Sequence, residues 1–524
     1  MKKKIPDSSA VGFAAESRHG SRTGAVCGKN VSARLEDNKN TLKTVFDSDK
    51  NFDLVFRDFI INIADREYSA FLIFFDGLSN KEFINRDILN PLMTQTAVEH
   101  HSGESLEDTI YKHMLTQAPN TKVFDMETVV DLVCFGNCAV FVDGCSCAFV
   151  ADIKGWSARS VGKPISEAVL TGPQEAFCET VMTNIALIRK ILKDSNLVAE
   201  NIPVGTKSKT PCALMYINGT TNVALVREAK RRLNGIDTEY IFSSSDIEML
   251  IEDSTLFPLP QLLKTERPDR AAAQLSDGKV IIIVQGSPFV LVLPATLRDL
   301  AEVSEDSYVR IAEANFMRFI RLVGCFLAVF LPGVFISTVL FHHESIPTDL
   351  IFAIEASREQ MPFPTLLELV IMILAFELIK EASTRVPEPI GSTLGIVGGL
   401  ILGQAAVSAN IASPLLIIIV SIAALGSFTA PTAAISRAIS VLQLAFVALG
   451  AVAGFLGIGF GIFALLGYMS AKKSFGVPYL EGSGNADNPF FVLPVWKREK
   501  RPSKLSPQNN KKQPHISRKW KGED

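Results

Sequence analysis

Long uncharged apolar runs occupy the last 40% of the chain. Residues 322–341 form twenty residues without a charge, which at about 1.5 Å rise per residue match a hydrocarbon core roughly 30 Å thick. Further apolar stretches lie at 366–379, 390–411 and 414–428, and an uncharged run of thirty-four residues covers 438–471. The pattern predicts a C-terminal α-helical transmembrane bundle over residues 311–471.

Two of these runs leave the number of crossings open. As one straight helix, residues 438–471 would measure about 51 Å, so their glycines indicate either a break into two spans or one tilted, kinked helix. Residues 366–379 contain Glu368 and Glu377 and form either a span or a re-entrant or interfacial segment. Arginines before the first run and lysines after the last favour a cytoplasmic position for both ends. The number of crossings is therefore even, four or six.

The first 310 residues mix strand and helix patterns. Residues 70–75 predict a buried strand, and residues 138–144 and 147–153 predict a hairpin. Further predicted strands cover 213–217, 280–284 and 289–292, and residues 175–192 and 223–233 carry apolar positions at helical spacing. We expect a mixed α/β soluble region of two subdomains, 46–127 and 128–310.

Composition distinguishes the two ends from the rest of the chain. Residues 1–45 are rich in Ser, Gly, Asn, Lys and Arg, which predicts a disordered leader. Residues 472–524 carry a net charge of +7 against −10 for the remainder, which predicts a basic cytoplasmic tail. The N-terminus has no apolar run typical of a signal peptide, so the soluble region is expected in the cytoplasm.

The chain carries none of the common enzyme signatures. The chain has no phosphate-binding loop, dinucleotide fingerprint or nucleophile elbow, and the zinc-protease pattern that starts at His343 has Pro347 at its second histidine position. The pair Cys145 and Cys147 has no second ligand pair at zinc spacing, and most cysteines have apolar neighbours typical of reduced packing residues. We therefore predict no catalytic residue, metal, cofactor or nucleic-acid partner.

Four glycines at successive i+4 positions give the first candidate site: Gly391, Gly395, Gly399 and Gly403. They fall near one face of a helix, where another backbone can approach closely. This spacing suits ordinary helix packing. It also suits a helix that lines or gates a pore in an oligomer, and Gln404 in the same span favours this second interpretation.

Charged residues within FELIKEASTRVPEP give the second candidate site. Glu377 and Glu381 lie one helical turn apart and Arg385 follows. Ionisable groups at membrane depth are costly and usually face a partner or water. These charges either end a helix at the membrane boundary, or Glu368 and Glu377 line a cation path.

From about residue 50 to residue 480, the chain resembles the A subunits of GerA-type spore germinant receptors. The resemblance rests on many ordered blocks, among them FFDGLSNKEFIN, REAKRRLNGID, TERPDRAAAQLSDGK, FELIKEASTRVPEP and SFGVPYL. The positions that match the family pattern include Glu377, Glu381, Arg385, Gly391, Gly399, Gly403 and Gln404.

The resemblance implies a membrane subunit of a nutrient sensor in the inner membrane of a bacterial spore. It implies homo-oligomers that form an ion channel for monovalent cations, with a transporter-like B subunit and a lipoprotein C subunit as partners. Nutrient recognition would then belong mainly to the B subunit. The alternative is a non-conducting scaffold subunit that assembles or couples a partner transporter.

Overall fold

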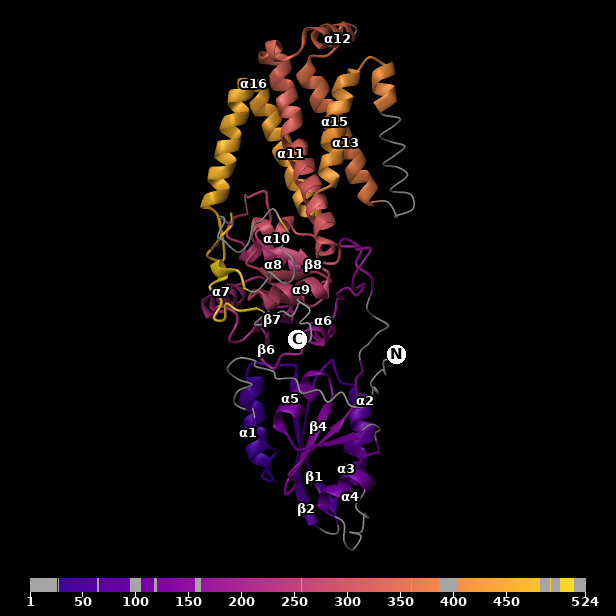
Figure 1. The fold of residues 1–524 in the computed structure, drawn as a ribbon, viewed down its shortest axis with the longest axis vertical. Coiled ribbons are helices and arrows are strands. Elements are labelled where there is room, and N and C mark those ends of the chain that lie inside the picture. Colours follow the sequence, from indigo (N-terminus) through magenta and orange to yellow (C-terminus); the bar gives the residue numbers. More distant parts are fainter. Residues whose placement is uncertain are drawn as a thin grey trace, which may run out of the picture. The chain divides into compact units, whose positions relative to one another are not determined.

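The computed structural model describes residues 26, 28–63, 66–94, 105–116, 120–155, 162–255, 257–359, 361–385, 403–480, 491 and 500–512 (Figure 1). The chain divides into two compact units. The first contains residues 1–157, 185–200 and 217–219, and the second contains residues 158–184, 201–216 and 220–524.

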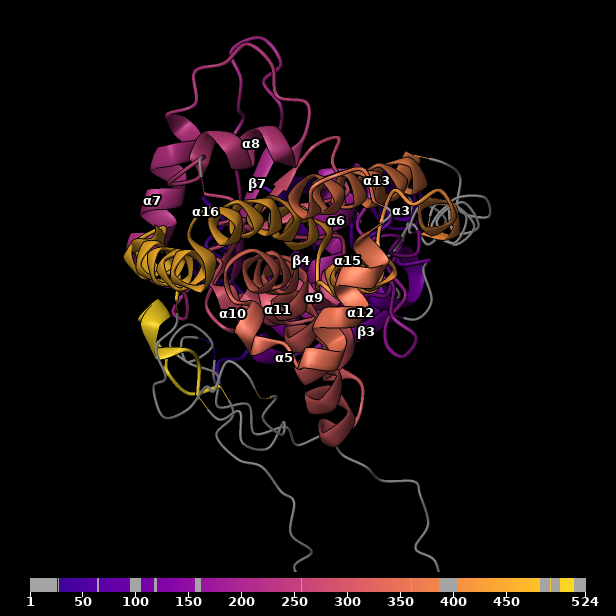
Figure 2. The same cartoon turned by 90° about the horizontal axis from the view of Figure 1, so that it is seen from above.

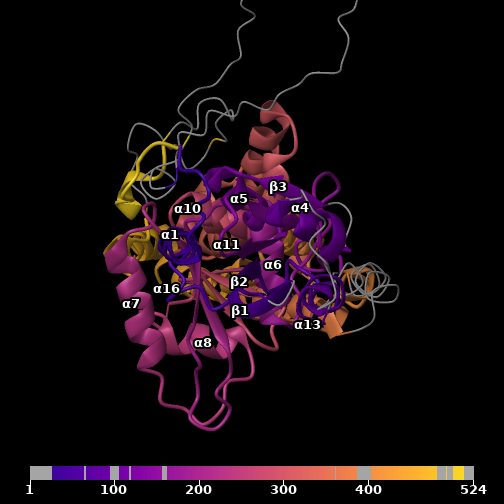
Figure 3. The same ribbon diagram turned by 90° about the horizontal axis from the view of Figure 1, so that it is seen from below.

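An antiparallel five-stranded sheet forms the centre of the first unit (Figure 3). Its order is β1-β2-β4-β5-β3, with bounds Leu54–Ile63, Arg66–Phe75, Cys138–Val142, Ala148–Ala151 and Asn120–Val123. Successive side chains of a strand point to opposite faces. Accordingly Phe71 and Ile73 of β2 enter one apolar core, and Leu72 and Phe74 enter another.

Helices cover both faces of this sheet. Helices α1 (Leu35–Phe46) and α5 (Met126–Cys134) pack on one face. The other face is covered by shorter elements, namely α2 (Lys81–Phe83), η2 (Ile84–Leu89), α3 (Asn90–Thr94), α4 (Leu106–Thr109) and η3 (Ile110–Met114). Burial on both sides explains the uninterrupted apolar run at 70–75. The buried strand and the β4–β5 hairpin are confirmed.

Helix α1 corrects the expected disorder of residues 1–45. Residues 35–45 belong to this helix, and Leu42, Val45 and Phe46 are buried in the core of the first unit. Their spacing of three and four residues places them on one helical face. The disorder prediction was wrong here because composition averaged over the whole leader concealed this short apolar stripe.

A buried ion pair lies in the first unit. Arg189 donates to both carboxylate oxygens of Asp53, at 2.5 and 2.8 Å, and to the side-chain oxygen of Asn51 at 3.1 Å. The side chains of Arg189 and Asp53 are 3% and 0% exposed. Ionised groups are rarely buried unless they are paired in this manner.

The second sheet has the order β6-β7-β9-β10-β8. The strand bounds are Leu197–Asn201, Cys212–Ile217, Val280–Val284, Val290–Leu293 and Leu263–Thr265. The accompanying helices are α6 (Val181–Ile191), α7 (Val223–Asn234), α8 (Ser244–Ile251), α9 (Pro268–Ser276), α10 (Leu297–Ala301) and η4 (Ser304–Ser307). The predicted strands at 213–217, 280–284 and 289–292 are therefore confirmed, as is the amphipathic helix at 223–233. The helix predicted over 175–192 is confirmed only from Val181 to Ile191.

The cysteines described in the two α/β regions are buried and unpaired: Cys134, Cys138, Cys145, Cys147, Cys178 and Cys212. Burial raises the pKa of the Cys145 thiol to about 12 and also opposes ionisation of Cys147. A thiol held in its neutral form is a poor nucleophile and a poor metal ligand. This environment agrees with the expected packing role.

Apolar helices form the rest of the second unit (Figure 2). They are α11 (Ile311–Phe341), α12 (Thr348–Arg358), α13 (Thr365–Arg385), α15 (Pro414–Phe428) and α16 (Ala433–Ala471), with the short helix η5 (His343–Ser345) after α11. Helices α11 and α16 are long and apolar enough to cross a membrane, and only 28% and 39% of their most apolar windows are buried. Apolar surface left this exposed is typical of a membrane protein rather than of a soluble core.

Helix α16 is broken at Gly454, whose φ of 60° and ψ of −145° are not helical. The two halves then pack against each other, since a Cβ on Gly461 would lie 2.8 Å from the ring of Phe446. In one straight helix these two residues would stand about 22 Å apart. The break into two helices, one of the two alternatives expected from the sequence, is the one observed (Figure 1).

Replacing Asp53 with Asn should strongly destabilise the chain. The change leaves the Arg189 guanidinium buried without a counter-charge, which costs about 3 kcal/mol or more. We expect the thermal unfolding temperature of the full chain in detergent to fall by several degrees. Asp58→Asn is the matched control because Asp58 pairs with Lys39 at the surface, where such a pair contributes at most about 1 kcal/mol. Equal shifts for the two variants would contradict this account.

Candidate functional site

Helix α13 carries the acidic residues predicted as a site. Glu368, Glu377 and Glu381 lie on it, and Arg385 is its last residue. The glycines Gly391, Gly395 and Gly399 lie outside the described residues. Beyond that gap, Gly403 is partly buried, with a Cβ position 3.8 Å from Ile417, and Gln404 is exposed.

Glu368 is buried, with 1% of its surface exposed, at the N-terminus of α15. Its Oε1 accepts a hydrogen bond from the backbone N–H of Ser413, the N-cap residue of α15. A carboxylate is favoured at this end of a helix because the first N–H groups lack partners and the helix dipole is positive there. Its second oxygen, Oε2, has no hydrogen-bond partner among the described residues. The carboxyl therefore keeps one unused acceptor in an apolar environment.

Glu377 and Lys380 belong to a polar network that joins three helices. The hydroxyl of Ser440 on α16 donates to Glu377 Oε1 at 2.6 Å. The Lys380 ammonium lies 3.4 Å from the same oxygen, and 3.2 and 3.5 Å from the hydroxyls of Ser440 and Ser427. The side chains of Glu377 and Lys380 are 35% and 17% exposed. Both charges are thus partnered within the bundle and still partly accessible.

Glycines bring the backbones of these helices together. A Cβ on Gly450 of α16 would lie 2.5 Å from the carbonyl oxygen of Gly333 on α11. A Cβ on Gly426 of α15 would overlap the carbonyl oxygen of Gly324, also on α11. Close packing of small residues is the main attraction between helices in lipid. Sequence reasoning missed Gly324, Gly333 and Gly426 because they show no regular i+4 spacing.

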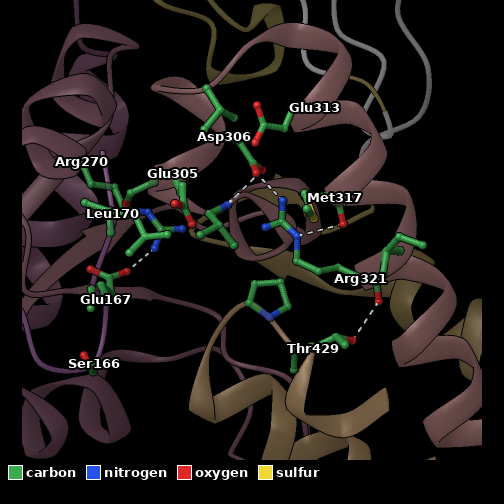
Figure 4. A pocket seen from close by; sticks show the side chains of 18 residues that line it. Ser166, Glu167, Leu170, Arg270, Glu305, Asp306, Glu313, Met317, Arg321 and Thr429 are labelled. Carbon is green, nitrogen blue, oxygen red and sulfur yellow. Dashed lines mark hydrogen bonds and ion pairs between the residues drawn. The ribbon is translucent and has the colours of Figure 1, made fainter. Parts of the chain in front are cut away.

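A second charged group lies where α11 begins (Figure 4). Asp306 of η4 accepts hydrogen bonds from Arg318, at 3.2 Å, and from Arg321. Asp306 and Arg318 are each 5% exposed. The hydroxyl of Thr429, at the end of α15, donates to the carbonyl of Gly426 at 2.7 Å and lies 3.5 Å from the backbone carbonyl of Arg321. These contacts connect the second α/β region to α11 and α15.

A cavity of about 540 Å³ lies beside this group and has a size typical of ligand pockets. One wall is residues 166–170, fixed by the TERPDR segment (Figure 4). There the Glu266 carboxylate accepts from the N–H and hydroxyl of Ser166, and Arg270 pairs with Glu167. Because Glu266, Glu167 and Arg270 already have partners in this wall, their contacts chiefly hold residues 166–170 in place.

Tyr308 also binds the TERPDR segment. Its hydroxyl donates to Asp269, and burial together with this bond raises the pKa of Tyr308 to about 12. Asp269 in turn pairs with Arg267, which is fully buried. The tyrosine therefore stays protonated as a donor over the physiological pH range.

The segment after α16 folds back onto the second α/β region. Its hairpin contains β11 (Lys473–Ser474) and β12 (Val477–Pro478). The Ser474 hydroxyl donates to the carbonyl of Gln261 at 2.7 Å, and the Tyr479 hydroxyl donates to the carbonyl of Pro260 at 3.0 Å. Both side chains are fully buried, and burial raises the pKa of Tyr479. The SFGVPYL block is therefore a docking segment.

Part of the basic tail also packs on this region. The short helix η7 (Ser503–Leu505) precedes Gln508, whose backbone N–H donates to the carbonyl of Thr220 at 3.0 Å. Arg501 donates to the carbonyl of Ser276 at 2.7 Å. These contacts fix residues 500–508 beside α7 and α9.

The sequence of the chain matches a known protein family and several of its members. The family model described as "Bacillus/Clostridium GerA spore germination protein" matches residues 40–504. Spore germination protein KA of Bacillus subtilis (strain 168) is 34% identical over 482 residues, 91% of this chain and 88% of that protein. The uncharacterized membrane protein YfkQ of the same organism is 34% identical over 489 residues, 92% and 93% of the two chains.

A solved structure also resembles part of the chain. The N-terminal domain of the A subunit of the Bacillus megaterium spore germinant receptor GerK3 is 26% identical, with a TM-score of 0.40. The match covers 51% of this chain and 98% of that domain.

Replacing Gly450 with Ala should weaken the helix bundle. The added methyl group would collide with the Gly333 carbonyl, and α11 and α16 would have to separate. We expect the unfolding temperature in detergent to fall by several degrees, although Ala favours an isolated helix over Gly by about 1 kcal/mol. The control is Gly459→Ala on the same helix, where a Cβ would meet nothing within 4 Å. Its unfolding temperature should stay equal or rise, and a loss as large as that of Gly450→Ala would contradict the packing argument.

Proposed function

The chain belongs to the GerA family of spore germination proteins, a family of germinant receptor A subunits, and from this we propose that it is a membrane subunit of a nutrient-sensing receptor. Its copies oligomerise into an ion channel in the inner membrane of the spore. The channel opens when the receptor complex detects nutrients, and the release of monovalent cations starts germination. A transporter-like B subunit and a lipoprotein C subunit complete the receptor.

The network of Glu377, Lys380, Ser427 and Ser440 is the observation that carries this proposal. Two charges and two hydroxyls gather where α13, α15 and α16 meet. Such groups are expensive at membrane depth and usually mark an ion path or a polar interface. Because 35% of the Glu377 side chain remains exposed in one chain, neighbouring copies in an oligomer can complete its environment.

The proposal includes six crossings with both termini in the cytoplasm. The start of α11 and the segment after α16 both bind the same α/β region, through Asp306 and through Ser474 and Tyr479, which supports an even number. The break at Gly454 supports two spans within α16. Helix α13, with 21 residues, is long enough to span a hydrocarbon core of roughly 30 Å.

In this arrangement the soluble part comprises two α/β regions, and residues 311–471 form the transmembrane domain. The boundary expected between subdomains 46–127 and 128–310 falls inside the first unit, because β4 and β5 belong to the same sheet as β1 and β2. The second α/β region is the part of the chain that would regulate the channel. It contacts both ends of the helical bundle, since Asp306 binds Arg318 of α11 and the N–H of Leu297 donates to the carbonyl of Tyr479 after α16. The pore-facing or packing role of Gly391, Gly395, Gly399, Gly403 and Gln404 stays part of the proposal. The charged residues proposed to lie within the membrane or at its boundary are Glu368, Glu377, Glu381 and Arg385.

A non-conducting scaffold subunit is the second candidate. One observation favours it: Glu377 and Lys380 find partners within a single chain, as the members of a purely structural network would. In this alternative a partner subunit carries the ions. Measurement of ion flux separates the two functions.

Glu377→Gln should reduce cation release from liposomes that contain the purified chain, alone or with its receptor partners. The change removes the charge while preserving the acceptor for Ser440, and we expect about a tenfold lower flux from a loss of roughly 1.4 kcal/mol in charge stabilisation. The control is Glu355→Gln on α12, which removes an exposed charge outside the network.

Two results would decide against the channel. Absence of cation flux from every reconstituted oligomer or complex would refute it. If Glu377→Gln impaired assembly while assembled protein kept its normal flux, the scaffold would be the better description.

A further inference from the structure

A separate cavity of about 340 Å³ lies where the uncharged part of α11 begins. Three arginines line it, Arg298 of α10 and Arg318 and Arg321 of α11. All the other residues that line it are apolar or cysteine, and no acidic residue is among them. The cavity therefore combines a cationic side with an apolar side.

The cationic side retains hydrogen-bonding capacity. Arg318 shares Asp306 with Arg321 and lies 3.6 Å from Glu302, and both acids lie outside the cavity lining. The Nε of Arg318 is buried and has no hydrogen-bond partner among the residues that the structure describes. An anion with several oxygens suits arginines placed this way, because each guanidinium presents several donors in one plane.

The apolar side identifies the kind of anion. Leu322 and Cys325 are in the first turn of the uncharged run of α11, and Ile435 is in the first turn of α16. In the membrane arrangement proposed above, both helices enter the hydrocarbon here, so the cavity spans the level of the lipid headgroups. A free inorganic anion would use only the arginines. An acidic lipid would use both sides, and basic pockets at the cytoplasmic ends of membrane helices are suited to such headgroups.

We propose that this cavity binds an acidic phospholipid. Its phosphate lies against Arg298, Arg318 and Arg321, and the beginning of an acyl chain lies along Leu322, Cys325 and Ile435. The proposal rests on the membrane placement given under the proposed function. Because Arg318 and Arg321 also hold Asp306, the bound lipid would touch the connection between the α/β region and α11.

Native mass spectrometry of the full chain tests this proposal. The detergent-solubilised protein is mixed with phosphatidylglycerol or with phosphatidylcholine of the same acyl chains. We expect phosphatidylglycerol to be retained in preference to phosphatidylcholine. Arg298→Gln should weaken its binding about fivefold or more, since one basic residue near an anionic lipid contributes about that factor. Arg298→Lys should keep most of the binding.

Arg310→Gln is the matched control. Arg310 is exposed, precedes α11 and does not line the cavity, so its loss should change lipid binding less than twofold. Equal weakening by Arg310→Gln and Arg298→Gln would mean general surface attraction and would overturn the proposal. Circular dichroism and the elution volume of each variant show that the change in binding is not a loss of fold.

A competition measurement and a vesicle insertion measurement distinguish failure of the lipid site from failure of the proposed function. Millimolar glycerol 3-phosphate, which lacks acyl chains, should not displace the lipid, and full displacement would identify a site for a soluble anion instead. Protein that inserts into vesicles but binds both lipids equally would refute the lipid site and leave the proposed function standing. A chain that fails to insert into any vesicle would contradict the membrane function itself.

Discussion

The cost of a polar side chain in hydrocarbon is the constraint on which this structure most depends. No water is available in the bilayer core, so each charge must find its partner inside the protein. In the membrane placement proposed above, Glu377 meets this requirement with Ser440 and Lys380, and Glu368 meets half of it with the N-terminus of α15. Glycines at the contacts of α11 with α15 and α16 serve a different purpose, since they let the backbones pack closely where lipid supplies no hydrophobic attraction.

Both ends of the helical bundle are attached to the second α/β region. Helix α11 is held at its start by Asp306, and the chain after α16 is held by the buried Ser474 and Tyr479. Both attachments are to the same α/β region. A rearrangement within that region would therefore act on the first and the last membrane helices together, which a single flexible linker would not allow.

The sequence predicts the parts of this structure that depend on neighbouring residues, and it does not predict contacts between residues far apart in the chain. The run at 70–75 and the uncharged residues 322–341 show their structure locally. The first is apolar at every position because both faces of β2 are buried, and the second is apolar over the length that a membrane span requires. Ser440, the hydroxyl partner of Glu377, is 63 residues away, and no local pattern indicates it. Arg318 and Arg321 were informative only about topology, because their pairing with Asp306 depends on how η4 meets α11. Helix α1 was missed for the opposite reason: its local stripe was present, but it was averaged with a polar leader.

Helix α15 is the element at which these interactions meet. Its N-cap residue Ser413 donates to Glu368, and Ser427 in its last turn lies 3.5 Å from Lys380. The hydroxyl of its C-cap Thr429 lies 3.5 Å from the carbonyl of Arg321, whose side chain holds Asp306. The contacts of α15 therefore link the neighbourhood of Asp306 to Glu368 and Lys380 of α13 through side chains and helix caps rather than through loops.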